Sequence, residues 1–269
     1  MAKPADMEKE IRSILASRKY AGLMLPEETL RDLLLQELPK YNSREDALKS
    51  ARQKLHNIVA PYLDHTDYDV CRKELKALKD NNDPAEMEAF CIRMLRQHDS
   101  TRERLPYMHD FYCCLQDLAE NPAIVLDLAC GLNPFALPWM SFDPACEYHA
   151  YDIHTPRVAL ENEFLQISGR QRLAEVRDIL VQPPEIEADA AWLFKEAHRL
   201  EKRRRGCSRD LFAALNVKKI LVTLPTRSLR GERDLQTRMR HLIESATSGR
   251  PWKTEEIHFP GETLFCITK

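Results

Sequence analysis

Hydrophobic residues recur at helical spacing through the first hundred positions, and the alternation typical of strands is not found there. Pro26 stands where a proline can open a helix, ahead of a stripe of leucines. Ser43 followed by Asp46 is a capping-box signal for a second helix, and a further amphipathic stretch begins at Pro84. The pattern therefore predicts an all-helical domain over residues 1–99.

From residue 100 onwards, short apolar runs alternate with helical segments, which is typical of an open, mostly parallel α/β sheet. Thr155 and Pro156 predict an N-cap and first turn for the helix after the second run. The last two runs flank Pro260-Gly261-Glu262 and predict a C-terminal antiparallel hairpin. Residues 100–269 are thus expected to form a Rossmann-like domain. The expected strands are 124–128, a run ending at 152, 173–176, 190–194, 220–224, 254–259 and 263–268.

The first strand of this domain carries one acid, Asp127, and runs into a tight turn at Gly131. The second strand ends at Asp152, which lies 152 − 131 = 21 residues beyond that glycine. An acid at this distance, at the tip of the second strand, suits the hydroxyls of a ribose. Asp178 follows the third strand and would lie at the same carboxyl edge.

The glycine turn continues as Leu132-Asn133-Pro134, so it lacks the Gly-x-Gly-x-x-Gly pattern that cradles a pyrophosphate. This favours S-adenosylmethionine over a dinucleotide. In that reading Asp152 takes the ribose hydroxyls, Asp178 takes the adenine amine, and Arg104 pairs with the methionine carboxylate. A lone acid after a strand is more often a helix cap or turn former than a ligand, and an arginine such as Arg104 taken alone is more often a surface helix residue.

Charge is distributed unevenly along a chain whose net charge is −2. Residues 1–104 hold 19 Lys/Arg and 19 Asp/Glu, residues 105–198 hold 5 against 15, and residues 199–240 hold 13 against 4. The late segment therefore carries +9, with Lys202, Arg203, Arg204 and Arg205 in one block. Such a block is either a solvated helix face or a phosphate-binding surface for nucleic acid.

Composition predicts a packed core, since 43% of the residues are hydrophobic and 30% are charged. Neither a signal-peptide core nor an apolar run of membrane-spanning length is found. The eight cysteines lack the spacing of a zinc site, so we expect no metal and free thiols in a reducing cytoplasm.

No nucleophile motif or acid–base pair is evident among the polar residues. That absence is informative if the methyl acceptor is already a nucleophile. Guanine N7 has a free lone pair and no proton to lose, so its methylation needs only placement close to the sulfonium.

Two motifs carry a resemblance to a known family, Asp-Leu-Ala-Cys-Gly-Leu-Asn-Pro at 127–134 and Pro-Thr-Arg-Ser-Leu at 225–229. Further matching stretches are 14–20, 51–56, 100–105, 151–154 and 193–195. On these residues the sequence resembles the aminoglycoside-resistance 16S rRNA methyltransferases, which make 7-methylguanine at nucleotide 1405, and the two motifs are the most specific to that family.

The resemblance implies that the helical domain docks on the 30S ribosomal subunit near helix 44 of its 16S rRNA, with the protein acting as a cytoplasmic monomer. It adds Asp127, Gly131 and Ile179 to the cofactor positions Arg104, Asp152 and Asp178. Lys195 and Arg227 become candidates for the target site. The RNA-binding candidates are Lys19, Arg52, His56, Arg203, Arg204, Arg205 and Arg227.

The chain departs from the family pattern at Glu196-Ala197-His198-Arg199 and at Arg230-Gly231-Glu232-Arg233-Asp234, which are more charged than expected. These segments motivate two alternatives. One is a methyltransferase of the same fold that acts on the N1 of a neighbouring decoding-site adenine or on a small molecule. The other is a non-catalytic RNA-binding relative.

Overall fold

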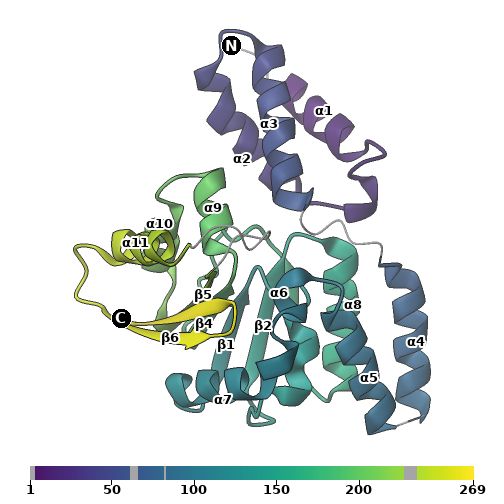
Figure 1. Ribbon diagram of the computed structural model, residues 1–269. Coiled ribbons are helices and arrows are strands. Elements are labelled where there is room, and N and C mark those ends of the chain that lie inside the picture. The colour runs from purple at the N-terminus through teal and green to yellow at the C-terminus, as the bar shows by residue number, and fades with distance from the viewer. Residues whose placement is uncertain (1–3, 61–65, 82, 227–234) are drawn as a thin grey trace.

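The computed structural model describes residues 4–60, 66–81, 83–226 and 235–269. Figure 1 shows two parts, a helical group at the top with the N-terminus and a larger α/β unit below it. The hydrophobic residues divide in the same way, with one core in the helical group and one on each face of the sheet.

The helical group consists of α1 (Pro4–Leu15), α2 (Glu27–Glu37) and α3 (Arg44–Val59). Its core includes Leu30, Leu33 and Leu55, all fully buried. The capping signal is confirmed, because Ser43 is the N-cap of α3 and its Oγ accepts from the backbone N–H of Asp46 at 3.4 Å. Short 3-10 turns follow α1 and α2, at Ala21–Leu23 and Leu38–Lys40.

Helices α4 (Tyr68–Asn81) and α5 (Pro84–Leu95) pack on the α/β unit and not on α1–α3. Leu75 and Phe90 belong to the same hydrophobic core as the sheet residues Val125 and Trp192. Figure 1 shows both helices beside α8 (Thr155–Ile167), far from the upper group. The hydrophobic cores therefore divide between α3 and α4, about forty residues before the boundary expected from sequence at residue 99.

The sheet has seven strands in the order β3-β2-β1-β4-β5-β7-β6, as predicted a mostly parallel sheet with a C-terminal antiparallel pair. The order reverses direction at β1, which pairs with β2 on one side and β4 on the other, so a crevice forms at the carboxyl ends there. The strands are β1 (Ile124–Leu128), β2 (Glu147–Asp152), β3 (Ala174–Val176), β4 (Ala188–Phe194), β5 (Val217–Pro225), β6 (Lys253–Phe259) and β7 (Glu262–Thr268).

Helices cover both faces of the sheet, which explains why its central strands are continuous apolar runs. One face packs against α5, α7 (Met108–Ala119) and α8, and the other against α9 (Ala197–Arg203), α10 (Cys207–Ala214) and α11 (Gln236–Thr247). Shorter helical turns lie at α6 (Asp99–Arg102), η4 (Leu105–Tyr107) and η5 (Asn133–Trp139).

The expected N-cap at Thr155 is wrong by one residue. His154 caps α8, with Nδ1 accepting from the backbone N–H of Arg157 at 3.2 Å, and Thr155 is the first helical residue. An imidazole can accept this bond as an aspartate or serine would, but cap statistics do not favour it. All eight cysteines are free, and no helix within the described ranges is long and apolar enough to span a bilayer.

A buried acid ties α2 to α3 in the helical group. Burial by itself would raise the pKa of Glu37, but hydrogen bonds from three donors outweigh it and lower the pKa to about 2. The donors are Lys40 Nζ at 2.7 Å, Lys54 Nζ at 2.8 Å and Ser50 Oγ at 2.6 Å.

The stability of the protein should therefore depend on the ionisation of Glu37. Its folded pKa lies below the ordinary glutamate value of 4.5, so the stabilisation is complete above that pH and is lost as the pH falls towards 2. Glu37→Gln should flatten the acid-side fall in unfolding free energy, measured by urea denaturation at a series of pH values. Glu45→Gln, at an exposed position in the first turn of α3, is the control and should keep the wild-type slope.

Candidate functional site

The turn after β1 brings backbone close to the tip of β2. Ala129 and Gly131 both have positive φ, 51° and 56°, a conformation that glycine adopts without strain. The N–H of Gly131 donates to Oδ2 of Asp152 at 3.0 Å. A Cβ on Gly131 would lie 3.3 Å from Nδ1 of His98, so a side chain here would make the imidazole move by a few tenths of an ångström. Cys130 stands between Ala129 and Gly131 in the turn. Burial raises the pKa of its thiol well above the ordinary value, so the thiol stays protonated and has a packing role.

Asp152 is oriented from three sides. Besides Gly131, the backbone N–H of His154 donates to Oδ1 at 2.8 Å, and Nη1 of Arg157 lies 3.3 Å from Oδ2. Arg157 is itself buried, with Nε donating to the hydroxyl of Tyr68 at 3.2 Å. The carboxylate predicted to hold a ribose is thus charge-compensated and fixed in direction.

Asp178 lies just beyond β3 and is held from two domains. Its Oδ2 accepts from Thr29 Oγ1 of α2 at 2.8 Å and lies 2.7 Å from Nη1 of Arg203 in α9. Its Oδ1 accepts from the backbone N–H of Leu180 at 3.1 Å. The helical group therefore reaches the predicted adenine end of the site directly.

A cavity of about 660 Å³, partly open to solvent, lies between these groups. Its polar walls include Asp152, Asp178 and Arg203, with Ile179 beside them. Leu23, Leu25, Ile58 and Val59 of the helical group form an apolar wall. Two carboxylates within an apolar cleft suit an adenosine group, with its ribose diol and exocyclic amine. The residues present therefore fit such a ligand.

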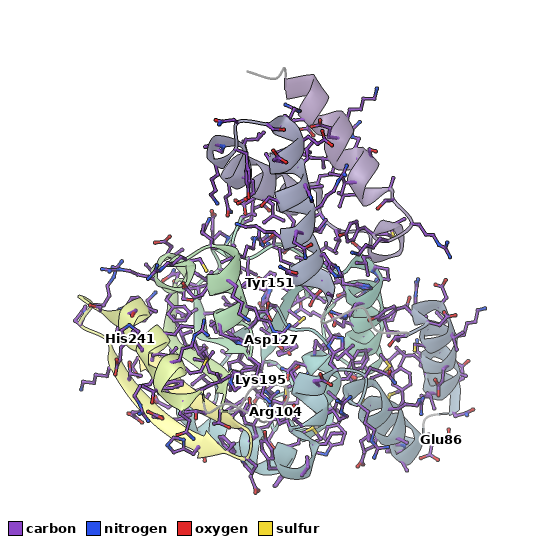
Figure 2. The ribbon with its side chains drawn as sticks, turned by 45° about the horizontal axis from the view of Figure 1, so that its top comes forward. Glu86, Arg104, Asp127, Tyr151, Lys195 and His241 are labelled. Carbon is purple, nitrogen blue, oxygen red and sulfur yellow. The ribbon has the colours of Figure 1, made fainter. Side chains whose placement is uncertain are left out.

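Arg104 and Asp127 lie behind this cavity and not on its wall. Nε and Nη2 of Arg104 each lie 2.9 Å from the carboxylate of Glu262, and the guanidinium stacks over the rings of Phe111 and Phe194 at 4.2 and 4.9 Å. Figure 2 shows Arg104, Asp127 and Lys195 grouped in the centre of the α/β unit.

A hydrogen-bonded chain links this interior pair to the glycine turn. Nη1 of Arg104 donates to Oδ1 of Asn133 at 3.4 Å, and Nδ2 of Asn133 donates to Asp127 at 2.8 Å. Burial raises the pKa of Asp127 to about 6, although Tyr148 and Asn133 donate to its carboxylate. Of the predicted cofactor residues, Asp152, Asp178 and Ile179 share the cavity, Gly131 supports it, and Arg104 and Asp127 lie in the adjoining interior.

Lys195 directly follows β4 and has a strained backbone conformation, with φ of 54°. Its backbone N–H donates to Thr223 Oγ1 at 3.1 Å, and its Nζ lies 2.7 Å from Glu103. Strain of this kind at the carboxyl edge is a feature of functional sites. The other target-site candidate, Arg227, lies outside the described residues.

Three RNA-binding candidates lie in the helical group. Lys19 and Arg52 are exposed, and His56 is half-buried one turn after Arg52 on α3. The ammonium of Lys19 lies 5.5 Å from the ring of Tyr20, and burial raises the pKa of Tyr20 while the charge of Arg52 opposes that shift. Lys19 and Arg52 thus both lie near the buried Tyr20, and their two charges form one basic patch.

The basic block on α9 does not act as one surface. Arg203 is buried and pairs with Asp178 and with Asp32 of α2, each at 2.7 Å, so the expectation that it faces RNA is not met. Arg204 is half-buried, and Lys202 and Arg205 are exposed. From the sequence alone the four cations of the block cannot be distinguished, because only the three-dimensional structure shows which helix face meets α2.

The surface around α9 is nevertheless strongly cationic. The pKa of His198 is lowered to about 3, first by burial and then by the positive charges of Arg199, Lys202, Arg238 and Lys195. These cations come from α9, from α11 and from the end of β4, so segments distant in sequence converge here.

Sequence reasoning missed Arg157, Glu262 and Thr29. Each pairs with a predicted cofactor residue, but none belongs to a spacing pattern that would reveal it. Arg157 begins a helix, Glu262 follows a hairpin turn, and Thr29 lies 149 residues before its partner Asp178.

The strand order, the cavity at the switch point and the acids at the tips of β2 and β3 define a class I methyltransferase. Residues 16–267 match the family model described as ribosomal RNA methyltransferase (FmrO). The chain therefore belongs to the ribosomal RNA methyltransferase family, which confirms the resemblance seen in the sequence.

Curated relatives cover most of the chain. A 16S rRNA (guanine(1405)-N(7))-methyltransferase of Frankia casuarinae is 31% identical over 264 residues, covering 96% of this chain and 92% of that protein. One from Serratia marcescens is 32% identical over 222 residues, covering 82% of this chain and 81% of that protein.

Solved structures agree with this assignment over the full length. The 16S rRNA methylase RmtB is similar with a TM-score of 0.77 at 26% identity, covering 99% of this chain and 100% of RmtB. The 16S rRNA methyltransferase RmtF, in complex with S-adenosyl-L-homocysteine, has a TM-score of 0.77 at 28% identity, covering 100% of both chains.

Alanine substitutions at two glycines with positive φ can separate the cost of backbone strain from the cost of steric contact. Gly169 has φ of 75° and nothing within 4 Å of an added Cβ, whereas Gly131 would contact His98. Gly169→Ala should cost about 1–2 kcal/mol of unfolding free energy from strain alone. Gly131→Ala should cost more and should also weaken binding of S-adenosylhomocysteine, because it displaces the N–H that orients Asp152. Urea denaturation and calorimetry measure the two effects, and equal costs with unchanged binding would contradict this role for the turn.

Proposed function

We propose that this protein methylates N7 of guanine 1405 in the 16S rRNA of the 30S subunit, with S-adenosylmethionine as the methyl donor, and so confers aminoglycoside resistance. The observation that carries the proposal is the shared name of the curated relatives, two of which cover more than four-fifths of the chain. The cavity at the carboxyl edge, lined by Asp152 and Asp178, is the candidate cofactor site in this chain.

The cofactor's adenosine would lie in the cavity, with its ribose at Asp152 and its adenine at Asp178 and Ile179. Its methionine carboxylate would then extend towards the interior, where Arg104 is the buried cation. Nη1 of Arg104 is the nitrogen that makes no contact with Glu262, and it lies beside Asn133 on the side of the glycine turn.

The methyl transfer requires little from the protein beyond placing the methyl donor and the guanine close together. S-adenosylmethionine supplies a methyl group on a sulfonium, and the N7 lone pair takes that group while the sulfur leaves as a neutral thioether. The purine ring carries the positive charge afterwards, and no proton has to be removed. A site without a general base therefore suits this acceptor, and positioning supplies the rate enhancement.

Lys195 is our candidate for holding the target nucleotide, because it directly follows β4 and its neighbour Glu196 lines the cavity. Glu103 holds its ammonium without RNA, and a phosphate can replace that carboxylate. The patch of Lys19, Arg52 and His56 and the exposed cations of α9 would contact phosphates on either side of the junction between the domains.

The proposed substrate also implies the partner, the cellular location and the oligomeric state. The partner is the 30S subunit in the region of 16S rRNA helix 44, and the protein works in the cytoplasm, where that subunit is assembled. We expect a monomer, because the basic surfaces of one chain lie on both of its domains and can meet one RNA surface.

Methyl transfer from labelled S-adenosylmethionine to purified 30S subunits tests the proposal, with free 16S rRNA and 50S subunits alongside. We expect label in 30S only, as 7-methylguanine, with borohydride and aniline cleavage at one nucleotide. Label in an adenine would support the neighbouring-position alternative. No label despite cofactor binding would favour another acceptor, and absence of both would favour the non-catalytic relative.

The exposed cations Lys202, in the last turn of α9, and Arg205, just beyond α9, should contribute to 30S binding. Lys202→Glu with Arg205→Glu should weaken binding about tenfold or more and reduce the slope of log affinity against log salt by about 2, one for each lost phosphate contact. Binding of S-adenosylhomocysteine should not change. Lys253→Glu, at the exposed start of the edge strand β6, is the control. An unchanged salt slope in the double variant would show that these cations do not contact the RNA.

A further inference from the structure

Glu161 of α8 is a buried acid that contacts the glycine turn and has no role in the site described so far. The residue is 0% exposed. Its Oε2 accepts from the thiol of Cys130 at 3.7 Å, and its Oε1 is buried without a hydrogen-bond partner among the described residues. An ionised carboxylate is costly in such a place, because it leaves water and gains only a neutral thiol in exchange. The contacts therefore favour a neutral carboxylic acid.

The charged groups that face Glu161 also disfavour its ionisation. Asp127 in β1 and Asp152 at the end of β2 are both acids, so a charged Glu161 would be a third negative charge among them. Arg157, one turn earlier on α8, is the cation that faces it, but Nη1 of this arginine lies 3.3 Å from Oδ2 of Asp152. Burial, followed by the charge of Asp152, raises the pKa of Glu161 well above its ordinary value, although Arg157 opposes the shift.

The turn that Glu161 contacts is strained and needs support from its surroundings. Ala129, which is not a glycine, has φ of 51°, a conformation that persists only where neighbouring contacts hold it. The backbone N–H of Cys130 donates to the carbonyl of Tyr151 at 2.9 Å, so β2 holds the turn through its backbone. The bond from the Cys130 thiol to Glu161 holds the turn through its side chain, from α8.

We propose that Glu161 is a positioning residue for the cofactor, a neutral acid that anchors Cys130 to α8 and so fixes the glycine turn. The next residue in the turn, Gly131, donates its N–H to Asp152 at 3.0 Å. The anchor thus helps to direct the carboxylate that is expected to hold the ribose. This inference rests on the proposed cofactor site and adds a residue that lies outside the cavity wall.

The neutral state of Glu161 is tested by the pH dependence of stability. In the unfolded chain this acid ionises around the ordinary glutamate value of 4.5, whereas in the folded protein it keeps its proton to higher pH. Its contribution to stability is therefore complete below pH 4.5 and is lost as the pH rises towards the folded pKa. Between about pH 5 and 7, the unfolding equilibrium constant of the wild type should rise with pH more steeply than that of Glu161→Gln, by up to about tenfold per pH unit.

Urea denaturation at a series of pH values measures this difference. Glu185→Gln removes the same charge at an exposed position and is the control, which should keep the wild-type slope. Equal slopes in the wild type and in Glu161→Gln would show that the acid is ionised in the folded protein and would overturn the proposal.

Calorimetry with S-adenosylhomocysteine tests the positioning role. Glu161→Gln keeps a neutral acceptor for the thiol and should bind this ligand within about twofold of the wild type. Glu161→Leu has no acceptor and should bind about 3- to 10-fold more weakly, the effect of losing one hydrogen bond. Cys130→Ala removes the same contact from the turn and should show a similar loss. The double variant Glu161→Leu with Cys130→Ala should lose no more than either single variant.

Cys130→Ala is the smaller change and serves as the test if Glu161→Leu does not fold. Wild-type affinity for S-adenosylhomocysteine in folded Cys130→Ala would overturn the positioning role while leaving the cofactor site in place. Losses that add fully in the double variant would also overturn it, because the two residues would then act separately. No binding of S-adenosylhomocysteine by the wild type would instead refute the proposed function.

Discussion

Charge compensation inside the molecule is the constraint on which the site depends. Asp152 and Asp178 bring two carboxylates to a largely buried edge of the sheet, and an isolated ion there would be strongly destabilising. Each has a buried arginine, Arg157 or Arg203, and the buried Arg104 has Glu262. These pairs allow the polar ends of a cofactor site to exist within an apolar core.

The same pairs connect parts of the chain that are distant in sequence. Arg203 joins the end of β3 to α2, and Arg157 joins the end of β2 to Tyr68 of α4. As a result, the three-helix group is both a candidate RNA-docking surface and a wall of the cofactor cavity. An enzyme that works by placement benefits from this arrangement, because the RNA-binding and cofactor-binding surfaces share rigid elements.

Local patterns were sufficient for the elements and for the class of site. The apolar run ending at Asp127, the glycine turn and the acid at Asp152 predicted parallel strands with a ligand at their carboxyl ends, because strand direction alone brings those ends together. Ser43 predicted its helix start because a cap is a contact within four residues. The prediction that the whole basic block faces RNA does not hold for the buried Arg203, because a count of charges cannot tell which side of a short helix will be covered.

By itself, the sequence determined the order of elements, the mostly parallel sheet, the methyltransferase class and the adenosine-type acids at the strand tips. Each of these depends on residues close together in the chain or on the geometry common to all parallel sheets. Only the tertiary structure decided where the hydrophobic cores divide, which cations are buried, and which partners hold Arg104, Asp152 and Asp178. Those features arise from contacts between segments up to 171 residues apart, whose energies depend on burial and direction that no local pattern records.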